Sequence, residues 1–306
     1  MSPESTAMSR RSRIGLALGS GGARGWCHIG VLRALAELGI RPDVVAGTSM
    51  GALVGAAWAA GRLDALEAWV RALTRARFMR LMDVDLRSGG LVEARGIETL
   101  LADLGIPDRI ENLAHPFAAV ATDMETGREV WFDKGPTYPA VRASAGIPGV
   151  MSPKRFDGRW LLDGGLTNPV PVSLARALGA EVILAVNPNG RAHGRIWQPR
   201  PARPGPGARA AALLPEALSQ AFGLETGAGS APPAPTYFDV LAAAIGTMET
   251  QILRARLAGE PPHVLLSAAF EDLTVLELYR GAEAIEAGAR LVARHKGAIL
   301  EACERG

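Results

Sequence analysis

The chain has 306 residues, of which 48% are hydrophobic, and a formal net charge of +2. This length suits one large α/β domain with a sizeable core, and a charge so close to zero gives no support for a nucleic-acid partner. Its two cysteines, Cys27 and Cys303, form neither a disulfide framework nor a zinc-binding pattern, which favours a reducing compartment. No uninterrupted apolar segment reaches the length of a membrane span.

The opening segment alternates short apolar runs with helical patterns. Residues 14–18 are predicted to form a buried strand, followed by a helix at 26–38, a second strand at 43–46 and a helix that reaches about residue 60. This order is typical of a parallel sheet covered by helices, so the predicted fold class is α/β. Further strands are predicted at 117–122, 130–132, 159–162, 182–186 and 264–266, and further helices at 63–73, 138–144, 170–178, 237–257 and 276–301.

Three segments are expected to depart from this regular pattern. Residues 1–13 carry three arginines but no apolar run ahead of a cleavage site, so they are interpreted as a flexible N-terminal arm and not as a signal peptide. Residues 78–91 carry spaced large apolar side chains, which suit a lid, a pocket wall or a satellite core under a loop. Proline, glycine and alanine crowd the region of about 190–236, which predicts a mobile loop interrupting a single domain at 14–306.

The pentapeptide Gly47-Thr48-Ser49-Met50-Gly51 lies between a predicted strand and a predicted helix. In that context Gly-x-Ser-x-Gly is typical of a nucleophile elbow, a turn so tight that a Cβ at the flanking positions would clash. The turn holds the serine hydroxyl clear of the sheet, beside helix-start amides that favour developing negative charge. The alternative is an ordinary strand-to-helix turn with a capping serine.

A glycine-rich loop at residues 19–25 follows the first predicted strand and precedes a helix. Its amides suit either a nucleotide phosphate or the oxyanion of an acyl-transfer intermediate. A phosphate loop would end in Gly-Lys-Ser/Thr, and the dinucleotide motif needs a glycine where Arg24 stands. Beside a serine elbow, the loop therefore favours the oxyanion role, with packing glycines at a helix start as the alternative.

Asp163 ends a predicted strand and precedes two glycines, at the kind of position where α/β sheets place ligands. An Asp-Gly pair alone is more typical of a turn, but a serine nucleophile needs a base. His193 lies in the low-complexity region, His263 follows two prolines, and His295 stands between charged residues of a helix. These contexts are typical of surface histidines. His28 is interpreted as a residue that packs in the core or supports the residues of the site, and not as the base. A Ser–Asp dyad is therefore favoured over a triad.

These three motifs, in this order, resemble the patatin-like phospholipase family, which pairs a glycine-rich oxyanion loop, a Gly-x-Ser-x-Gly nucleophile and an Asp-Gly-Gly/Ala aspartate. Residues 121–127 and 142–149 extend the resemblance, and the aspartate motif continues to residue 171. The chain looks like small single-domain bacterial members, akin to the catalytic domain of neuropathy target esterase. It departs from the pattern at Ser20, where many members have glycine. The resemblance implies a three-layer α/β/α patatin-like fold with a mostly parallel central sheet.

The resemblance also implies a mechanism without a metal or a soluble cofactor. Ser49 would attack the ester carbonyl of a lipid, and Asp163 would take its proton and later activate water. The amides of Gly21 and Gly22 would bind the oxyanion, with Arg24 assisting in orientation or charge. The expected protein is a serine lipid acyl hydrolase that forms an acyl-enzyme from a phospholipid, a lysophospholipid or another acyl ester.

Other functions stay open at this point. A catalytically silent patatin-like protein would bind lipid or regulate without cleaving, and a nucleotide-binding module would use the glycine loop alone. An acyltransferase is a close variant of the hydrolase, because an acyl-enzyme can pass to an alcohol instead of water. The expected location is the cytoplasm, with peripheral contact at the inner membrane face through apolar positions of residues 78–91.

Overall fold

The computed structural model describes residues 11–81, 95–190, 235 and 237–305. Within them, one eight-stranded sheet has the strand order β5-β6-β3-β2-β1-β7-β8, and β4 also pairs with β3. The strands are β1 (Ile14–Leu18), β2 (Val44–Thr48), β3 (Phe117–Asp123), β4 (Glu129–Phe132), β5 (Lys154–Phe156), β6 (Arg159–Asp163), β7 (Val182–Gly190) and β8 (Val264–Ala269).

The five strands β3, β2, β1, β7 and β8 are parallel, whereas β4, β5 and β6 run antiparallel to their neighbours. The α-helices are α1 (Cys27–Glu37), α2 (Met50–Ala59), α3 (Leu63–Arg71), α4 (Arg75–Leu81), α5 (Arg95–Asp103), α6 (Thr137–Ser144), α7 (Val172–Ala177), α10 (Tyr237–Gly259) and α11 (Gly281–Arg305). The short 3-10 helices are η1 (Gly22–Trp26), η2 (Ile110–Asn112), η3 (Gly164–Leu166) and η5 (Leu278–Arg280).

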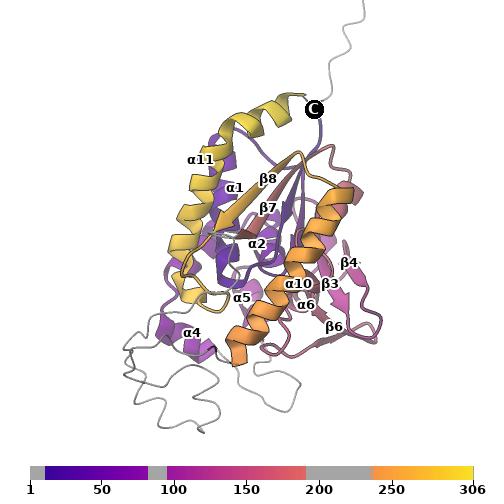
Figure 1. Cartoon of the computed structure of the whole chain (residues 1–306), viewed down its shortest axis with the longest axis vertical. Helices are drawn as coiled ribbons and strands as arrows, with labels where there is room; N and C mark the ends of the chain where they lie inside the picture. Colours follow the sequence, from indigo (N-terminus) through magenta and orange to yellow (C-terminus); the bar gives the residue numbers. More distant parts are fainter. Residues whose placement is uncertain (1–10, 82–94, 191–234, 236, 306) are drawn as a thin grey trace, which may run out of the picture.

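Side chains alternate between the two faces of the sheet, and helices cover both faces. On β1, Leu16 and Leu18 belong to the larger hydrophobic core, whereas Ala17 between them belongs to a second core. The larger core includes residues of α1, α2, α3, α6 and α11, and the second is covered by α7 and the C-terminal half of α10. Figure 1 shows α1 and α11 on one side of β7 and β8, with α10 on the other. The predicted three-layer α/β fold with a mostly parallel sheet is therefore confirmed.

Strand β3 carries two partners in succession along one of its edges. Its residues 117–120 pair in parallel with β2, and Ala121 then pairs with Asp163 of the antiparallel β6. Because β4 pairs with residues 119–122, it occupies the opposite edge alongside both partners. The strands β2 and β6 therefore lie end to end on the same edge of β3, and Thr48 and Asp163 stand at the ends that face each other.

Strand β1 lies where the strand order reverses, because the chain places β2 on one side of it and β7 on the other. Open α/β sheets bind ligands at such a point, outside the carboxyl ends of the strands. Here those carboxyl ends lead into the glycine loop after β1 and into Ser49 after β2, while Asn189 lies near the end of β7.

The structure adds elements that the sequence pattern did not predict. The helix α5 and the three-residue strand β5 are both new, and β7 continues four residues beyond its predicted end at residue 186. The predicted arm at 1–13, lid at 78–91 and loop at 190–236 lie mostly outside the described residues. Among the helices described, not one combines the length and the apolar character that crossing a bilayer requires.

Candidate active site

Ser49 occupies the tight turn between β2 and α2 in a strained backbone conformation, with φ 57° and ψ −120°. Glycine is required on both sides of the turn because neighbouring backbone atoms lie too close to leave room for a Cβ. A Cβ at Gly51 would lie 2.1 Å from the carbonyl oxygen of Leu18, and a Cβ at Gly47 would lie 2.5 Å from the Cα of Ala52. Such strain costs about 1–3 kcal/mol and is concentrated at functional sites.

The turn brings the Ser49 hydroxyl against the carboxyl group of Asp163. Ser49 Oγ donates a hydrogen bond of 2.6 Å to Asp163 Oδ2, and Asp163 Oδ1 accepts a second bond of 2.8 Å from the Gly165 amide. Both side chains are buried, at 3% and 5% exposure. The two residues come from the facing ends of β2 and β6, so the end-to-end arrangement of these strands on β3 creates the pair.

Burial raises the pKa of Asp163 to about 6, although hydrogen bonds from Ser49 and Gly165 act in the opposite direction. Removal from water disfavours the charged form of a carboxyl group, and here this effect outweighs that of the two hydrogen bonds. A carboxylate with this raised pKa is a stronger base than an exposed aspartate while remaining ionised at neutral pH.

The glycine loop lies beside this pair, and two of its amides donate to no backbone carbonyl of the described residues. The amides of Gly19, Ser20, Ala23 and Arg24 all donate to backbone carbonyls, whereas those of Gly21 and Gly22 have no backbone acceptor in the described part of the chain. Gly22 has φ 52°, and a Cβ there would lie 2.2 Å from the Val275 carbonyl oxygen. The loop thus presents free donors of the kind that bind an oxyanion.

Two polar side chains, one buried and one half-buried, hold this loop in place. His28 is fully buried, its Nε2 lies 2.8 Å from the Gly19 carbonyl oxygen, and burial lowers its pKa to about 4. The neutral ring therefore donates to the loop, which agrees with its interpretation as a residue that packs in the core or supports the site. Arg24 donates to the carbonyl of Leu273 and to Oδ1 of Asn189, so it ties the loop to neighbouring segments. Its assistance to the oxyanion stays a prediction.

Glu249 on α10 is a second carboxyl group at the site, and no motif in the sequence predicted its place there. Its Oε1 accepts a 3.2 Å hydrogen bond from Ser20 Oγ. The position that a Cβ on Gly165 would take lies 2.1 Å from Glu249 Oε1 and 3.0 Å from Asp163 Oδ1, so both carboxyl groups flank this glycine. Burial, and then the charge of Asp163, raise the pKa of Glu249 to about 8. At neutral pH one carboxyl group is therefore ionised and the other protonated.

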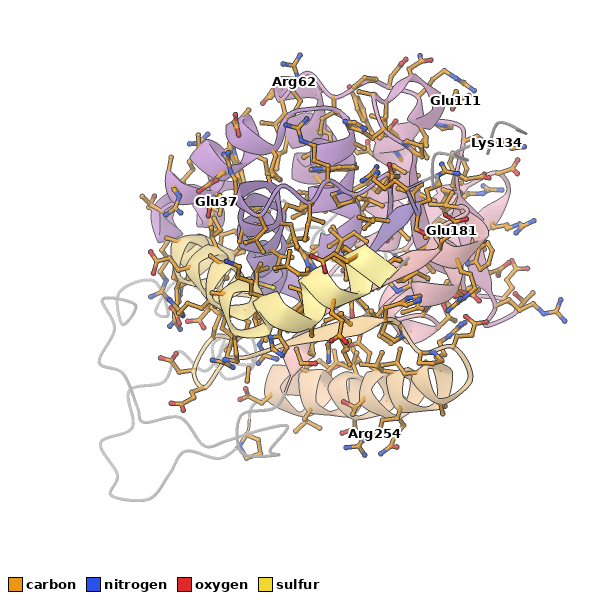
Figure 2. The ribbon with its side chains drawn as sticks, turned by 90° about the horizontal axis from the view of Figure 1, so that it is seen from above. Glu37, Arg62, Glu111, Lys134, Glu181 and Arg254 are labelled. Carbon is orange, nitrogen blue, oxygen red and sulfur yellow. The ribbon has the colours of Figure 1, made fainter. Side chains whose placement is uncertain are left out.

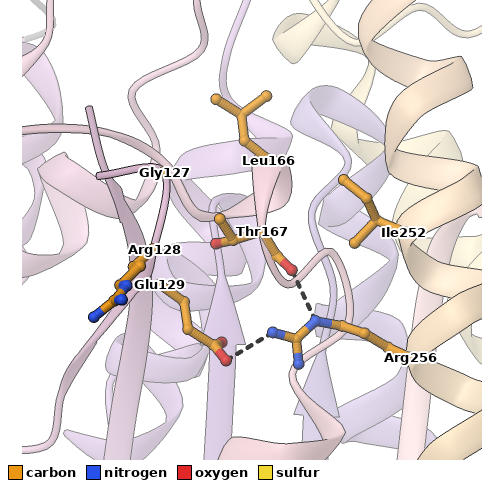
Figure 3. Close-up of a pocket in the computed structure, with 7 residues that line it drawn as sticks. All are labelled: Gly127, Arg128, Glu129, Leu166, Thr167, Ile252 and Arg256. Atoms are coloured by element: carbon orange, nitrogen blue, oxygen red, sulfur yellow. Dashed lines mark hydrogen bonds and ion pairs between the residues drawn. The ribbon is translucent and has the colours of Figure 1, made fainter. Parts of the chain in front are cut away.

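The helix α10 is fixed over η3 two turns beyond Glu249. Arg256 donates a 2.8 Å hydrogen bond to the Thr167 carbonyl oxygen and forms a 2.7 Å ion pair with Glu129. Figure 2 shows Arg254 on the same helix pointing away from the sheet. The contacts of Arg256 border an open cavity of about 490 Å³, drawn in Figure 3 and lined by Gly127, Arg128, Glu129, Leu166, Thr167, Ile252 and Arg256.

Replacing Glu249 with glutamine is expected to make protein stability less dependent on pH. Because the pKa of Glu249 is raised from 4.5 in an unfolded chain to about 8 in the folded chain, the folded state binds this proton more tightly, and folding stability falls as pH rises from about 4.5 to about 8. Glutamine does not titrate. Urea unfolding should therefore give similar free energies for both proteins near pH 5 and a more stable variant near pH 9.

The matched control is Glu260→Gln, which removes an exposed charge just beyond the end of α10. This variant should follow the wild-type pH dependence. A Glu249→Gln protein whose stability kept the wild-type slope between pH 5 and pH 9 would contradict the assignment of a protonated Glu249.

The histidines weighed against Asp163 make other contacts. His263 Nδ1 accepts a hydrogen bond from the Ile183 amide near the start of β7, and His295 Nδ1 lies 2.9 Å from the Leu291 carbonyl oxygen within α11. His193 lies outside the described residues. The described part of the chain holds no group of three or more His, Cys, Asp or Glu side chains suited to a metal ion.

A family model described as patatin-like phospholipase matches residues 16–176, more than half of the chain. The chain belongs to the patatin-like phospholipase family. The matched region contains the glycine loop, the Ser49 turn and Asp163, whereas Glu249 and the rest of α10 lie beyond it.

Several known proteins match part of the sequence of this patatin-like protein. It is 46% identical over 182 residues to an uncharacterised NTE family protein of Mycobacterium tuberculosis, covering 60% of this chain and 51% of that one. It is 33% identical to mouse patatin-like phospholipase domain-containing protein 7, and the match covers 58% of this chain and 14% of the mouse protein. It is 35% identical to the Drosophila melanogaster neuropathy target esterase sws, and that match covers 57% of this chain and 13% of the fly protein. The match thus spans about half the length of the mycobacterial relative.

Among solved structures, VipD from Legionella pneumophila resembles this patatin-like protein with a TM-score of 0.47 and 14% sequence identity, covering 93% of this chain and 66% of that one.

Proposed function

We propose that this patatin-like protein is a serine lipid acyl hydrolase that works through Ser49 and Asp163. The observation that carries the proposal is the 2.6 Å hydrogen bond between these buried side chains. The free amides of Gly21 and Gly22 support it, because acyl transfer needs donors for the oxyanion as well as a nucleophile and a base.

In the proposed first half-reaction, Ser49 Oγ attacks the ester carbonyl carbon while its proton passes to Asp163 Oδ2. The carbonyl oxygen becomes an oxyanion and accepts hydrogen bonds from the Gly21 and Gly22 amides. Collapse of this intermediate breaks the bond to the alcohol, which takes the proton from Asp163. The products are a free alcohol and an acyl group esterified to Ser49.

In the second half-reaction, Asp163 takes a proton from water, which attacks the acyl-enzyme. The same amides hold the second oxyanion, and Ser49 recovers its proton as the fatty acid leaves. All proton transfers in this scheme use Ser49, Asp163, water and substrate. A carboxylate whose pKa lies near 6 suits both roles, because it accepts and returns a proton close to neutral pH.

The alternative of a protein that only binds lipid has less support. A binding protein has no need for a strained serine at φ 57°, or for a buried carboxylate that costs stability. The alternative of a nucleotide site is also weaker, because the first strand and glycine loop lie beside a Ser–Asp pair and lack the lysine of a phosphate loop.

A fluorophosphonate probe combined with a substrate panel tests the proposal. The probe should label the wild-type protein at Ser49, and labelling should abolish acyl release from lysophospholipid, diacyl phospholipid or p-nitrophenyl ester, whichever the protein cleaves. The matched control is Ser173→Ala, which removes a hydroxyl that accepts a hydrogen bond from the Asn168 side chain and should leave labelling unchanged. Absence of both labelling and acyl release would favour the lipid-binding alternative. Acyl transfer to an added alcohol in preference to water would identify an acyltransferase.

A further inference from the structure

The end of helix α6 contacts the backbone of both dyad residues. The Ser49 amide donates a 2.8 Å hydrogen bond to Ser144 Oγ, and the Asp163 amide donates a 3.0 Å bond to the Gly146 carbonyl oxygen. Ser144 is the last residue of α6 and is fully buried. Three consecutive residues, 144–146, therefore hold the chain on both sides of the Ser49–Asp163 hydrogen bond.

The sheet alone leaves the spacing of the dyad loosely fixed. Because β2 and β6 lie end to end on β3, each strand is aligned to β3 and not to the other. A small shift of either strand along β3 would change the distance from Ser49 to Asp163. The segment 144–146 bridges the two strand ends directly, and it is anchored by the buried residues Val141 and Ala143 of α6.

We propose that the segment 144–146 sets the geometry of the dyad, with Ser144 as a positioning residue that holds the Ser49 turn at hydrogen-bond distance from Asp163. The inference rests on the proposed function of the dyad. Ser144 touches neither the reacting hydroxyl nor the carboxylate through its side chain. It acts on the peptide group of Ser49, whose positive φ aims the amide into the protein at Ser144 Oγ.

This role has a signature that a merely structural serine would lack. The hydrogen bond from Ser49 lowers the pKa of Asp163 against the effect of burial. If loss of Ser144 Oγ lets the turn move, this bond weakens and the pKa of Asp163 rises. The acid side of the pH–activity profile, where Asp163 becomes protonated, then shifts to higher pH.

The experiment compares Ser144→Ala and Ser144→Cys with the wild-type protein. For Ser144→Ala, kcat/KM on an ester should fall by about 10–100-fold, because a displacement of about 1 Å in reacting groups has effects of this size. KM should stay within about twofold, and the acid limb should move above its wild-type position near pH 6. Cysteine preserves the packing with a weaker acceptor, so the Ser144→Cys protein should show a smaller loss and a smaller shift.

Thr137→Val is the matched control at the other end of the same helix. Thr137 is fully buried, and its hydroxyl has no hydrogen-bond partner in the described part of the chain. This variant should keep wild-type kcat/KM and acid limb. If Ser144→Ala fails to fold, Ser144→Cys is judged by the same two measurements.

Wild-type kcat/KM and an unmoved acid limb in the folded Ser144 variants would overturn the positioning role. So would a loss of activity in them that left the acid limb in place. Ser49→Ala in the same assay separates this result from failure of the proposed function, because activity that survived without Ser49 would reject the dyad and not the role of Ser144.

Discussion

Replacing Ser49 with alanine is expected to lower ester hydrolysis by about 10⁴-fold or more, to the level of the uncatalysed reaction assisted only by binding. The substitution removes the nucleophile, so no acyl-enzyme can form. Steady-state hydrolysis and fluorophosphonate labelling check this result, and both should be lost together. Activity within tenfold of wild type would exclude Ser49 as the nucleophile.

A companion variant shows that the loss is chemical and not a consequence of misfolding. Ser49→Gly also lacks the hydroxyl, but glycine adopts positive φ without the strain imposed on alanine. The glycine variant is expected to be about 1 kcal/mol more stable to urea than the alanine variant and equally inactive. Inactivity in a protein that folds more stably can be attributed to the missing hydroxyl.

Replacing Asp163 with asparagine is expected to lower kcat/KM by about 10³-fold or more. The asparagine amide can still accept the bond from Gly165 and contact Ser49, but it cannot take the proton. The wild-type kcat/KM should fall about tenfold per pH unit below pH 6 as Asp163 is protonated, whereas the residual activity of the variant should show no such limb. A variant that retained the limb would assign it to another group.

The same substitution is expected to stabilise the fold at neutral pH. The pKa of Asp163 in the folded chain, about 6, lies above that of an unfolded aspartate, so ionising it destabilises the folded state. The contribution of Asp163 to wild-type stability should fall between about pH 4 and pH 6 and stay lower above that, a difference of about 3 kcal/mol. Asparagine does not ionise, so the variant does not lose this stability as pH rises. Urea unfolding at pH 7 should therefore show an inactive variant that is more stable than the wild type.

The sequence predicted those parts of the site that depend on local backbone geometry. The glycines around Ser49 and after Asp163 mark places where a Cβ would clash, and such requirements are visible in the residues themselves. The order of short apolar runs and helical patterns along the chain likewise predicted a parallel sheet covered by helices. The family resemblance then joined motifs that lie far apart along the chain.

The rest of the site depends on contacts that leave no local pattern. Glu249 lies in a helix whose sequence contains no motif that distinguishes this glutamate from other polar residues. It contacts the site only because α10 packs over η3, which places its carboxyl group beside Gly165. Ser144 lies within a segment that supported the resemblance, yet its role depends on which amide its hydroxyl meets. The strand β5 was not predicted because it has three residues, two of them basic, and a segment of this length cannot show a periodic pattern of apolar residues.

The dyad residues are 114 positions apart, yet they meet on one edge of β3. Contacts between such distant residues close late in folding, because the entropy of the intervening loop opposes them. During synthesis, Ser49 leaves the ribosome long before Asp163, so the nucleophile exists for a time without its base. If the proposed dyad is correct, a growing chain stays unreactive toward esters until β6 docks on β3, and hydrolytic activity reports this docking.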